Sequence, residues 1–417
     1  MMRNKRRIFF FAVVTLLLCQ FSWAQMGEEE GLSKEITIED AVRIALENNL
    51  ELKALRERLD MAEGGLTSAG LFPNPEFETE ILSTDAGNRI ELRLSQEFQI
   101  GGQRGKRKNV GRMNLEKVRS KIADGGRLLT GEVREGFYEV VLLQEKVKLA
   151  DQVVGLNGEL AKIAGTQFRA GLIPEFEVNL ARVKLQGALL EKMRVANELS
   201  ISKMRLNNLL GRPAETALKI EGGLIYNPIE LDLNLLKDFA LEHRSDLRRL
   251  QFEERMMDQA VSLAKSERIP DIGLSAIYEQ EPEGDRSFGA EVTIPLPLFN
   301  RNQGEIRTSL AEKRSVGFER ENQERVVERE VTTAYMEYNL SKEVLDSYEK
   351  KILGLVEESL QLIRWAYRRG ETGILEAVVA QEEFVEARGA YLDALFRHNV
   401  AIARLEEAIG GRLTEVK

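Results

Sequence analysis

Two regions of the chain alternate apolar and polar residues with a period of two. In the first region the alternating residues are Ile90, Leu92 and Leu94 on one face and Glu91, Arg93 and Ser95 on the other. A similar alternation runs through residues 272–278 and 288–294. Because successive side chains of a strand point to opposite faces, the pattern predicts strands. The four predicted strands lie at about 76–82, 90–98, 272–279 and 288–296.

The predicted strands have two chemically different faces. One face is apolar and the other carries several carboxylates, among them Glu76, Glu78 and Glu80. A membrane barrel with lipid outside and water inside satisfies both faces, and each strand is near the length that crosses a bilayer when tilted. Because about eight strands are needed to close a barrel, we expect several chains to share one. The alternative is a soluble hairpin whose apolar face packs on a core.

Apolar residues recur at steps of three and four residues after each pair of strands. One stripe comprises Leu345, Tyr348, Ile352, Leu355, Ser359, Leu362 and Ala366, and a second comprises Val356, Leu360, Ile363 and Tyr367. Each stripe matches one neighbouring helix, so two stripes predict a helix that is flanked on both sides. We expect two long helices at about 103–168 and 303–368, each roughly 100 Å in length.

The chain contains an internal duplication. The segment 45–55 aligns with 240–250, and the segment 168–171 aligns with 367–370. Each copy has the same predicted order, which is a helix of about 33 residues, two strands, a long helix, a tight turn and a return helix. In the first copy the short helix is expected at about 38–70 and the return helix at about 175–211. The predicted divisions are a first repeat at 25–211, a linker at 212–233, a second repeat at 234–410 and a tail at 411–417.

The predicted fold class is mainly α with a small membrane β part. The short helix and the return helix together are nearly as long as the long helix, so they could lie end to end beside it. This arrangement predicts a cylinder of helices, with a β-barrel at one end and tight turns at the other. A plain coiled-coil rod is the alternative, but it does not explain the paired strands.

The first residues resemble a secretory signal peptide. A basic start is followed by an apolar run from Ile8 to Leu18 and by small residues near Ala24. The run is shorter than the roughly 20 residues that a membrane-spanning helix needs. We therefore expect residues 1–24 to be removed. Cys19, the single cysteine, would leave with them, and Leu18 before it argues against lipidation because lipoprotein processing prefers a small residue there.

Composition excludes several classes of function. The chain has a formal charge of -9, so its basic cluster at 104–108 does not indicate nucleic-acid binding. His243 and His398 are far apart in sequence and lack metal-ligand spacing. Neither a phosphate-binding loop nor a nucleophile elbow is present. We therefore expect no enzyme activity, no cofactor and no metal site.

The two strand-to-helix corners resemble those of TolC-like outer-membrane efflux proteins, especially the CzcC-like heavy-metal branch. The resemblance rests on the segments 96–104 and 295–306 and extends over the mature chain. The corner residues are Gly101, Gly102, Pro295, Pro297, Asn300 and Gly304. The resemblance implies a homotrimer with a twelve-stranded barrel in outer-membrane lipid and a helical periplasmic tunnel. It also implies a periplasmic adaptor (a membrane fusion protein) and an inner-membrane pump such as the RND type.

The resemblance also suggests a periplasmic gate and an adaptor contact. In the family, acidic residues just after the second turn can form a ring, and alignment places Glu376 at the first such position and Val379, a departure, at the second. Glu371 lies in the turn itself. Three copies of one carboxylate would attract cations. The candidate adaptor-contact residues at the turns are Gly171, Leu172, Pro174, Arg368, Arg369 and Gly370. Ordinary solvated surface is the alternative for both groups.

Two classes of function fit these observations. The first is an outer-membrane exit channel, either for efflux of substrates such as metal cations or drugs, or for type I secretion. The second is a non-conducting periplasmic coiled-coil tether. The alternating strands and the signal peptide favour the channel.

Overall fold

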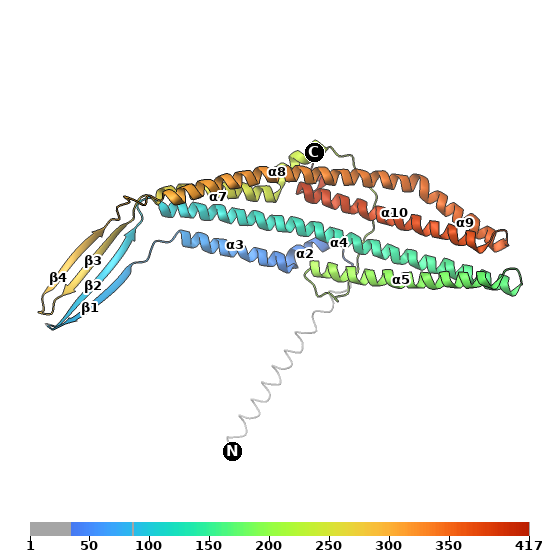
Figure 1. Cartoon of the computed structure of the whole chain (residues 1–417), viewed down its shortest axis with the longest axis horizontal. Coiled ribbons are helices and arrows are strands. Elements are labelled where there is room, and N and C mark those ends of the chain that lie inside the picture. Colours follow the sequence, from blue (N-terminus) through green and yellow to red (C-terminus); the bar gives the residue numbers. More distant parts are fainter. Residues whose placement is uncertain (1–34, 86, 417) are drawn as a thin grey trace, which may run out of the picture. The chain divides into compact units, whose positions relative to one another are not determined.

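A computed structural model describes residues 35–85 and 87–416 of the chain (Figure 1). The predicted signal peptide, with Cys19, lies outside these residues. The chain forms two compact units. The first unit comprises Val133–Ile225 and Tyr348–Phe396 with the described residues up to Ala45, and the second comprises Leu46–Glu132, Tyr226–Ser347 and the segment from Arg397. Each unit therefore combines segments of both predicted repeats.

The second unit contains one antiparallel sheet in the order β1-β2-β3-β4 (Figure 1). The strands are β1 (Glu76–Thr84), β2 (Gly87–Phe98), β3 (Ile272–Gln280) and β4 (Arg286–Thr293). The hairpin of one repeat joins the hairpin of the other through β2 and β3, which pair from Phe98↔Ile272 to Ile90↔Gln280. Strands β1 and β4 are therefore the edges of the sheet.

Strand β4 ends earlier than the alternation predicts. The pattern predicts a strand to residue 296, but the ladder stops at Thr293. Pro295 and Pro297 follow, and proline has no backbone N–H to donate to a neighbouring strand. The apolar alternation thus continues past the hydrogen-bonded strand, which is why sequence alone extends it too far.

The first long helix is a single element, α4 (Gln103–Arg169), and it returns as α5 (Glu175–Leu209). The second long helix, predicted at about 303–368, is helical from Gln303 to Arg369 but contains a π-helical turn. The structure has α8 (Gln303–Ser347), a π-helical turn (Tyr348–Ile352) and α9 (Leu353–Arg369), followed by α10 (Ile374–Ile409). Among the helices of the described residues, none has both the length and the apolar character needed to cross a membrane.

The π-helical turn changes which residues share a face. A π turn holds more residues than an α turn, so it shifts the positions that follow around the helix axis. Leu345 before the turn is buried, whereas Leu355 and Leu362 after it are 66% and 61% exposed. Leu360 and Tyr367, from the other predicted stripe, are buried. The predicted stripe from 345 to 366 is therefore not one continuous face.

The predicted 33-residue helix that opens each repeat is also interrupted. The first repeat has α2 (Ile38–Asn48) and α3 (Leu50–Ala69), and the second has α6 (Leu233–His243) and α7 (Ser245–Ser266). Asn49 and Arg244 occupy the two breaks with nearly identical backbone angles, φ -56° and ψ 127° against φ -61° and ψ 126°. The Asn49 side chain accepts a hydrogen bond from the backbone N–H of Leu52 (3.0 Å), as a helix N-cap does.

Each unit has its own apolar core. In the first unit, Leu160 of α4 and Val178 of α5 pack with Tyr367 of α9 and Val378 of α10. In the second unit, Leu236 of α6, Val331 of α8 and Leu405 of α10 belong to one cluster. Leu413, in the predicted C-terminal tail, is buried in that cluster, so part of the tail belongs to the fold.

The predicted linker contains hydrogen bonds that hold it to the helices of its own unit. The Tyr226 hydroxyl donates to a carboxylate oxygen of Asp346 (2.8 Å). The Tyr338 hydroxyl donates to the carbonyl of Ile229 (2.7 Å) and accepts from the backbone N–H of the same residue (2.6 Å). This irregular segment is therefore fixed by hydrogen bonds of the half-buried Tyr226 and the buried Tyr338 rather than by secondary structure of its own.

A buried ionic cluster surrounds the break at Arg244. This guanidinium, whose side chain is 2% exposed, donates to Asp246 (2.6 Å), to Glu330 (2.7 Å) and to the carbonyl of Ala408 (2.9 Å). Burial alone would raise the pKa of Asp246, but the hydrogen bonds and charge of Arg244 outweigh burial and hold that pKa below its usual range. Gln323 donates a further hydrogen bond to Asp246 (2.9 Å). The cluster links α7 to α8 and α10.

We expect the substitution Asp246→Asn to lower the free energy of unfolding by about 3 kcal/mol, because it leaves the buried Arg244 charge partly uncompensated. Since the pKa of Asp246 is lowered by folding, its contribution is present above roughly pH 3.9 and is lost as the pH falls through the lowered value. Denaturant unfolding followed by circular dichroism at several pH values measures both effects. The variant should lose this pH dependence.

Glu139→Gln is the matched control. Glu139 lies 3.8 Å from Arg205, and both side chains are exposed. Removing such a pair changes stability by about 0.5 kcal/mol or less. An equal loss in both variants would contradict a special role for the buried cluster.

Candidate functional site

The apolar face of the sheet is uncovered within the described residues. Phe77, Leu94 and Val292 are all more than half exposed, and Phe288 is 84% exposed. The register places Phe77 opposite Leu94, and Leu94 in turn opposite Ala276, so the apolar residues of neighbouring strands form rows. An exposed apolar face that crosses four strands marks a surface that contacts a membrane or another protein.

The opposite face of the sheet is charged. Arg93 binds Glu291 of β4 (2.6 Å) and Glu91 of its own strand (2.9 Å). Arg89 pairs with Glu279 of β3 and lies 3.6 Å from Glu281. The two arginines therefore connect three strands across a face that is suited to water.

The first corner, between β2 and α4, uses both predicted glycines for different reasons. Gly102 has φ +72°, a conformation that favours glycine. A Cβ on Gly101 would come within 2.8 Å of the carbonyl oxygen of Ser266. Sequence reasoning missed Gln103, which is buried and donates to the carbonyl of Ile269 (3.0 Å) and to Asp271 (2.9 Å). These bonds join the corner to the start of β3.

The second corner, between β4 and α8, depends on two asparagines. Asn300 accepts a hydrogen bond from the backbone N–H of Asn302 (3.0 Å). Asn302, which the sequence analysis missed, has φ +58° and donates to the carbonyl of Ala264 (2.9 Å). Pro295 and Pro297 lie in the preceding irregular segment, where the N–H of Leu298 bonds to the carbonyl of Leu296 (2.8 Å). A Cβ on Gly304 would stand in open space, so packing does not require glycine there.

The two helical turns have the same hydrogen-bond pattern. At the first, the N–H of Gly171 bonds to the carbonyl of Phe168 (2.9 Å) and that of Leu172 to Gln167 (2.9 Å). At the second, Gly370 bonds to Tyr367 (3.0 Å) and the next residue to Ala366 (3.0 Å). Gly171 and Gly370 have φ +71° and +74°, which explains glycine at both positions. Pro174 then precedes the first residue of α5, and Leu172 is exposed.

The candidate adaptor residues Arg368 and Arg369 already have partners in the first unit. Arg368 and Arg364 of α9 both bind Glu159 of α4. Burial alone would raise the pKa of Glu159, but the hydrogen bonds from the two arginines hold it below its usual range. The Arg369 guanidinium stacks on the Trp365 ring at 4.0 Å. The Gln167 amide also donates to the carbonyl of Tyr367 (3.3 Å), so the two turns lie beside each other.

The three candidate gate residues lie close together near the second turn. Glu376, in the first turn of α10, is exposed. Its carboxylate lies beside Gly373, because a Cβ added at residue 373 would be 2.9 Å from Glu376 Oε2. Val379 follows one turn later and is 46% exposed. Glu371 lies 3.7 Å from Arg369, which partly compensates its charge. The structure thus leaves Glu376 as an exposed carboxylate beside an exposed valine.

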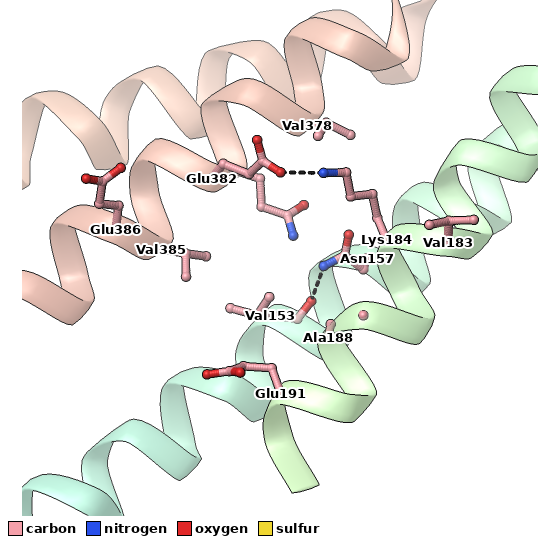
Figure 2. Close-up of a pocket in the computed structure, with 12 residues that line it drawn as sticks. Val153, Asn157, Val183, Lys184, Ala188, Glu191, Val378, Glu382, Val385 and Glu386 are labelled. Carbon is pink, nitrogen blue, oxygen red and sulfur yellow. Dashed lines mark hydrogen bonds and ion pairs between the residues drawn. The ribbon is translucent and has the colours of Figure 1, made fainter. Parts of the chain in front are cut away.

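A pocket of about 520 Å³ lies in the first unit between α4, α5 and α10 (Figure 2). Its lining includes Val153, Val183, Val378 and Val385 with Asn157, Lys184, Glu191, Gln381, Glu382 and Glu386. Lys184 binds Glu382 across the pocket (2.5 Å), as Figure 2 shows. Of the three carboxylates in the lining, Glu382 is paired with Lys184 and Glu191 with Arg194 (2.5 Å). Sequence reasoning missed the pocket because Glu382 and Glu386, one turn apart, look like any charged helix face.

Comparisons with known sequences agree with the duplicated architecture. The family described as outer membrane efflux protein matches residues 41–212 and 236–411. The cobalt-zinc-cadmium resistance protein CzcC of Cupriavidus metallidurans is 25% identical over 377 residues, which are 90% of this chain and 90% of that protein.

Solved structures share the fold. A crystal structure of CusC superposes with a TM-score of 0.75 at 17% identity, and the match covers 90% of this chain and 92% of CusC. The outer membrane protein VceC of Vibrio cholerae gives a TM-score of 0.74 at 16% identity, covering 90% and 96%. The family match extends over both repeats and most of the chain. The chain therefore belongs to the outer membrane efflux protein family, and its place is the outer membrane.

Proposed function

We propose that the protein is the outer-membrane exit channel of a three-component efflux system and works as a homotrimer. The observation that carries the proposal is the four-stranded sheet, which is apolar and uncovered on one face and charged on the other. This is a section of a barrel wall with lipid outside and water inside. The channel provides a passive route out of the cell and carries out no chemistry of its own.

The edges of the sheet support the trimer. Within the described part of the chain, β1 and β4 each pair on one side only. In lipid, unpaired backbone N–H and C=O groups cost several kcal/mol each, so an open sheet cannot span a membrane. Three copies supply twelve strands, and pairing β1 of one copy with β4 of the next closes the barrel.

The name of one relative and the charge of the inner face bear on the cargo. The relative CzcC is named for resistance to cobalt, zinc and cadmium, which favours metal cations, and drugs are the second class. The acidic inner face fits the passage of cations. Selection of the cargo would lie in the inner-membrane pump, of the RND type or another. A type I secretion duct would use the same architecture with a different pump. A non-conducting tether would leave the apolar face of the sheet without a function.

The pocket supports docking of a periplasmic adaptor. It lies in the same unit as the two turns, and its lining combines four valines with Glu386 and with the paired carboxylates Glu191 and Glu382. A basic, partly apolar segment of a partner fits this lining. Arg368 and Arg369, already engaged with Glu159 and Trp365, would shape the turns rather than bind the partner through free charge.

We expect the purified mature protein to have the mass of a trimer in detergent and to form ion-conducting channels in planar bilayers. Multi-angle light scattering gives the mass, and single-channel recording gives the conductance. A monomer that never conducts would contradict the channel and favour the tether.

We expect Glu376→Gln to reduce the preference of the channel for cations over anions, because three exposed carboxylates are neutralised together. Reversal potentials in a salt gradient measure this preference. Glu371→Gln is the comparison variant, since Arg369 partly compensates that carboxylate. An unchanged preference in Glu376→Gln would remove this residue from the proposed gate.

We expect Gly187→Leu to abolish resistance in cells while leaving the trimer mass and the conductance unchanged. Gly187 lines the pocket, and a Cβ there meets no atom within 4 Å, so a side chain can begin there without a backbone clash and occupy part of the pocket. Survival of cells that carry only the variant gene, tested on metals, detergents and antibiotics, measures the effect.

Gly155→Leu is the control, because Gly155 of α4 also has open space and does not line the pocket. Full resistance in the Gly187→Leu cells would contradict docking at this pocket. Equal loss of resistance in both variants would contradict it as well.

A further inference from the structure

The four connections between the sheet and the helices of the second unit carry exposed apolar side chains. These connections join α3 to β1, β2 to α4, α7 to β3 and β4 to α8. One set of apolar residues in them is at least 45% exposed, and Phe299 reaches 92%. We call this set the apolar band, and it comprises Leu71, Phe72, Ile100, Ile269, Leu298 and Phe299.

A basic cluster lies on the helix side of the apolar band. It contains the lysines and arginines of residues 104–108, and no acidic residue stands between Glu97 and Glu116. Arg268, just after α7, and Arg301, just before α8, complete the cluster. Within the part of the chain that the structure describes, none of these cations forms an ion pair. Positive charge near the start of a helix is unfavourable, so helix stability does not explain the cluster.

Hydrogen bonds hold the segments of the cluster side by side. Gln103 of α4 donates to the carbonyl of Ile269 (3.0 Å) and to Asp271 (2.9 Å). Asn302 donates to the carbonyl of Ala264 (2.9 Å) and to a carboxylate oxygen of Glu267 (3.1 Å). The two acids therefore have neutral partners of their own, and the cations of the three segments add to one positive surface.

In each connection that carries a cation, the apolar residue lies on the sheet side and the cation on the helix side. A membrane interface has the same order, because hydrocarbon gives way there to charged headgroups. The pairs, named from the sheet outward, are Ile100 with residues 104–108, Ile269 with Arg268, and Phe299 with Arg301.

Contacts tie the cluster to the apolar face of the sheet. Gln96 lies on the same face as Leu94, two residues earlier, and donates to the carbonyl of Pro73 (3.1 Å). The neighbouring Phe72 ring lies 4.0 Å from the guanidinium carbon of Arg104. Arg104 is thus joined through this segment to the face that lipid would cover, and not to the charged face.

The opposite end of the sheet has the opposite charge. The hairpin tips expose Asp85 between β1 and β2, and Glu281, Glu283 and Asp285 between β3 and β4. Only the helix end of the sheet is therefore suited to an anionic surface.

We propose that the basic cluster binds anionic phospholipid in the leaflet nearer the helices. Phosphate groups lie against the lysines and arginines, and acyl chains lie against the apolar band. The inference rests on the lipid-embedded barrel proposed above and names the lipid class at its helix end. An anionic lipid is favoured over a neutral one because the cluster has no acidic partner within the described residues.

Electron spin resonance of labelled lipids tests the proposal. The purified mature protein is reconstituted into phosphatidylcholine vesicles that contain spin-labelled phosphatidylglycerol or, as the neutral reference, spin-labelled phosphatidylcholine. The fraction of each label that is immobilised beside the protein gives the relative association constant of the two lipids. The same vesicles are fused with a planar bilayer to record conductance and ion preference.

We expect the protein to prefer phosphatidylglycerol by about fivefold, the factor that one cation at an anionic surface supplies, and Lys108→Gln/Arg268→Gln/Arg301→Gln to abolish this preference. The three side chains are exposed, so their replacement leaves the fold intact. The matched control is Arg58→Gln/Lys219→Gln/Arg329→Gln, which removes the same charge from exposed positions away from the connections. It should keep the preference.

A channel that conducts but shows no preference for phosphatidylglycerol would overturn the lipid site and leave the channel standing. Equal loss of preference in the two variants would also overturn the site, because net charge alone would then explain it. An unchanged lipid preference with an altered ion preference in the first variant would place the cations in the water-filled interior instead. A protein that never inserts or conducts would overturn the barrel on which the inference rests.

Discussion

The long helices are stable only where neighbours cover more than one of their sides. A helix gains most of its stability from packing an apolar face, and these helices carry apolar residues on two. In the first unit, α9 buries Leu360 and Tyr367 against its own chain and leaves Leu355 and Leu362 exposed. The core of this unit, in which α4, α5, α9 and α10 pack together, follows from this requirement. Within the described chain, the second apolar side of α9 stays uncovered.

The two repeats meet the same structural needs with different residues. At the helix break, Asn49 caps α3 with its own side chain, whereas Arg244 reaches into a buried cluster with Asp246 and Glu330. The Asn49 hydrogen bond joins neighbouring residues, whereas the Arg244 cluster joins α7, α8 and α10. The corners differ in the same way, since one bends at Gly102 and the other at Asn302. Duplication therefore preserved the backbone path while the stabilising contacts diverged.

The sheet, like the long helices, has surfaces that its own chain leaves uncovered. Its apolar rows have no cover within the described chain, and its edges each lack a partner strand there. In the barrel proposed above, lipid would cover the apolar rows and a neighbouring copy would pair with each edge. The charged face is internally balanced in part, because Arg93 and Arg89 each contact two glutamates. The remaining carboxylates leave that face acidic.

The sequence by itself determined the repeated order of elements, the four strands, the first long helix and both glycine turns. These features depend on local patterns, namely period-two alternation, heptad spacing and residues that tolerate positive φ. The cap at Asn49 and the prolines after Thr293 act locally, although the alternating patterns did not single them out. Tertiary structure alone decided the cluster at Arg244 and the pocket between α5 and α10, because both join residues far apart in sequence, such as Arg244 with Ala408 or Lys184 with Glu382. Local pattern carries no record of such contacts, because the same charged residues on an isolated helix would face water.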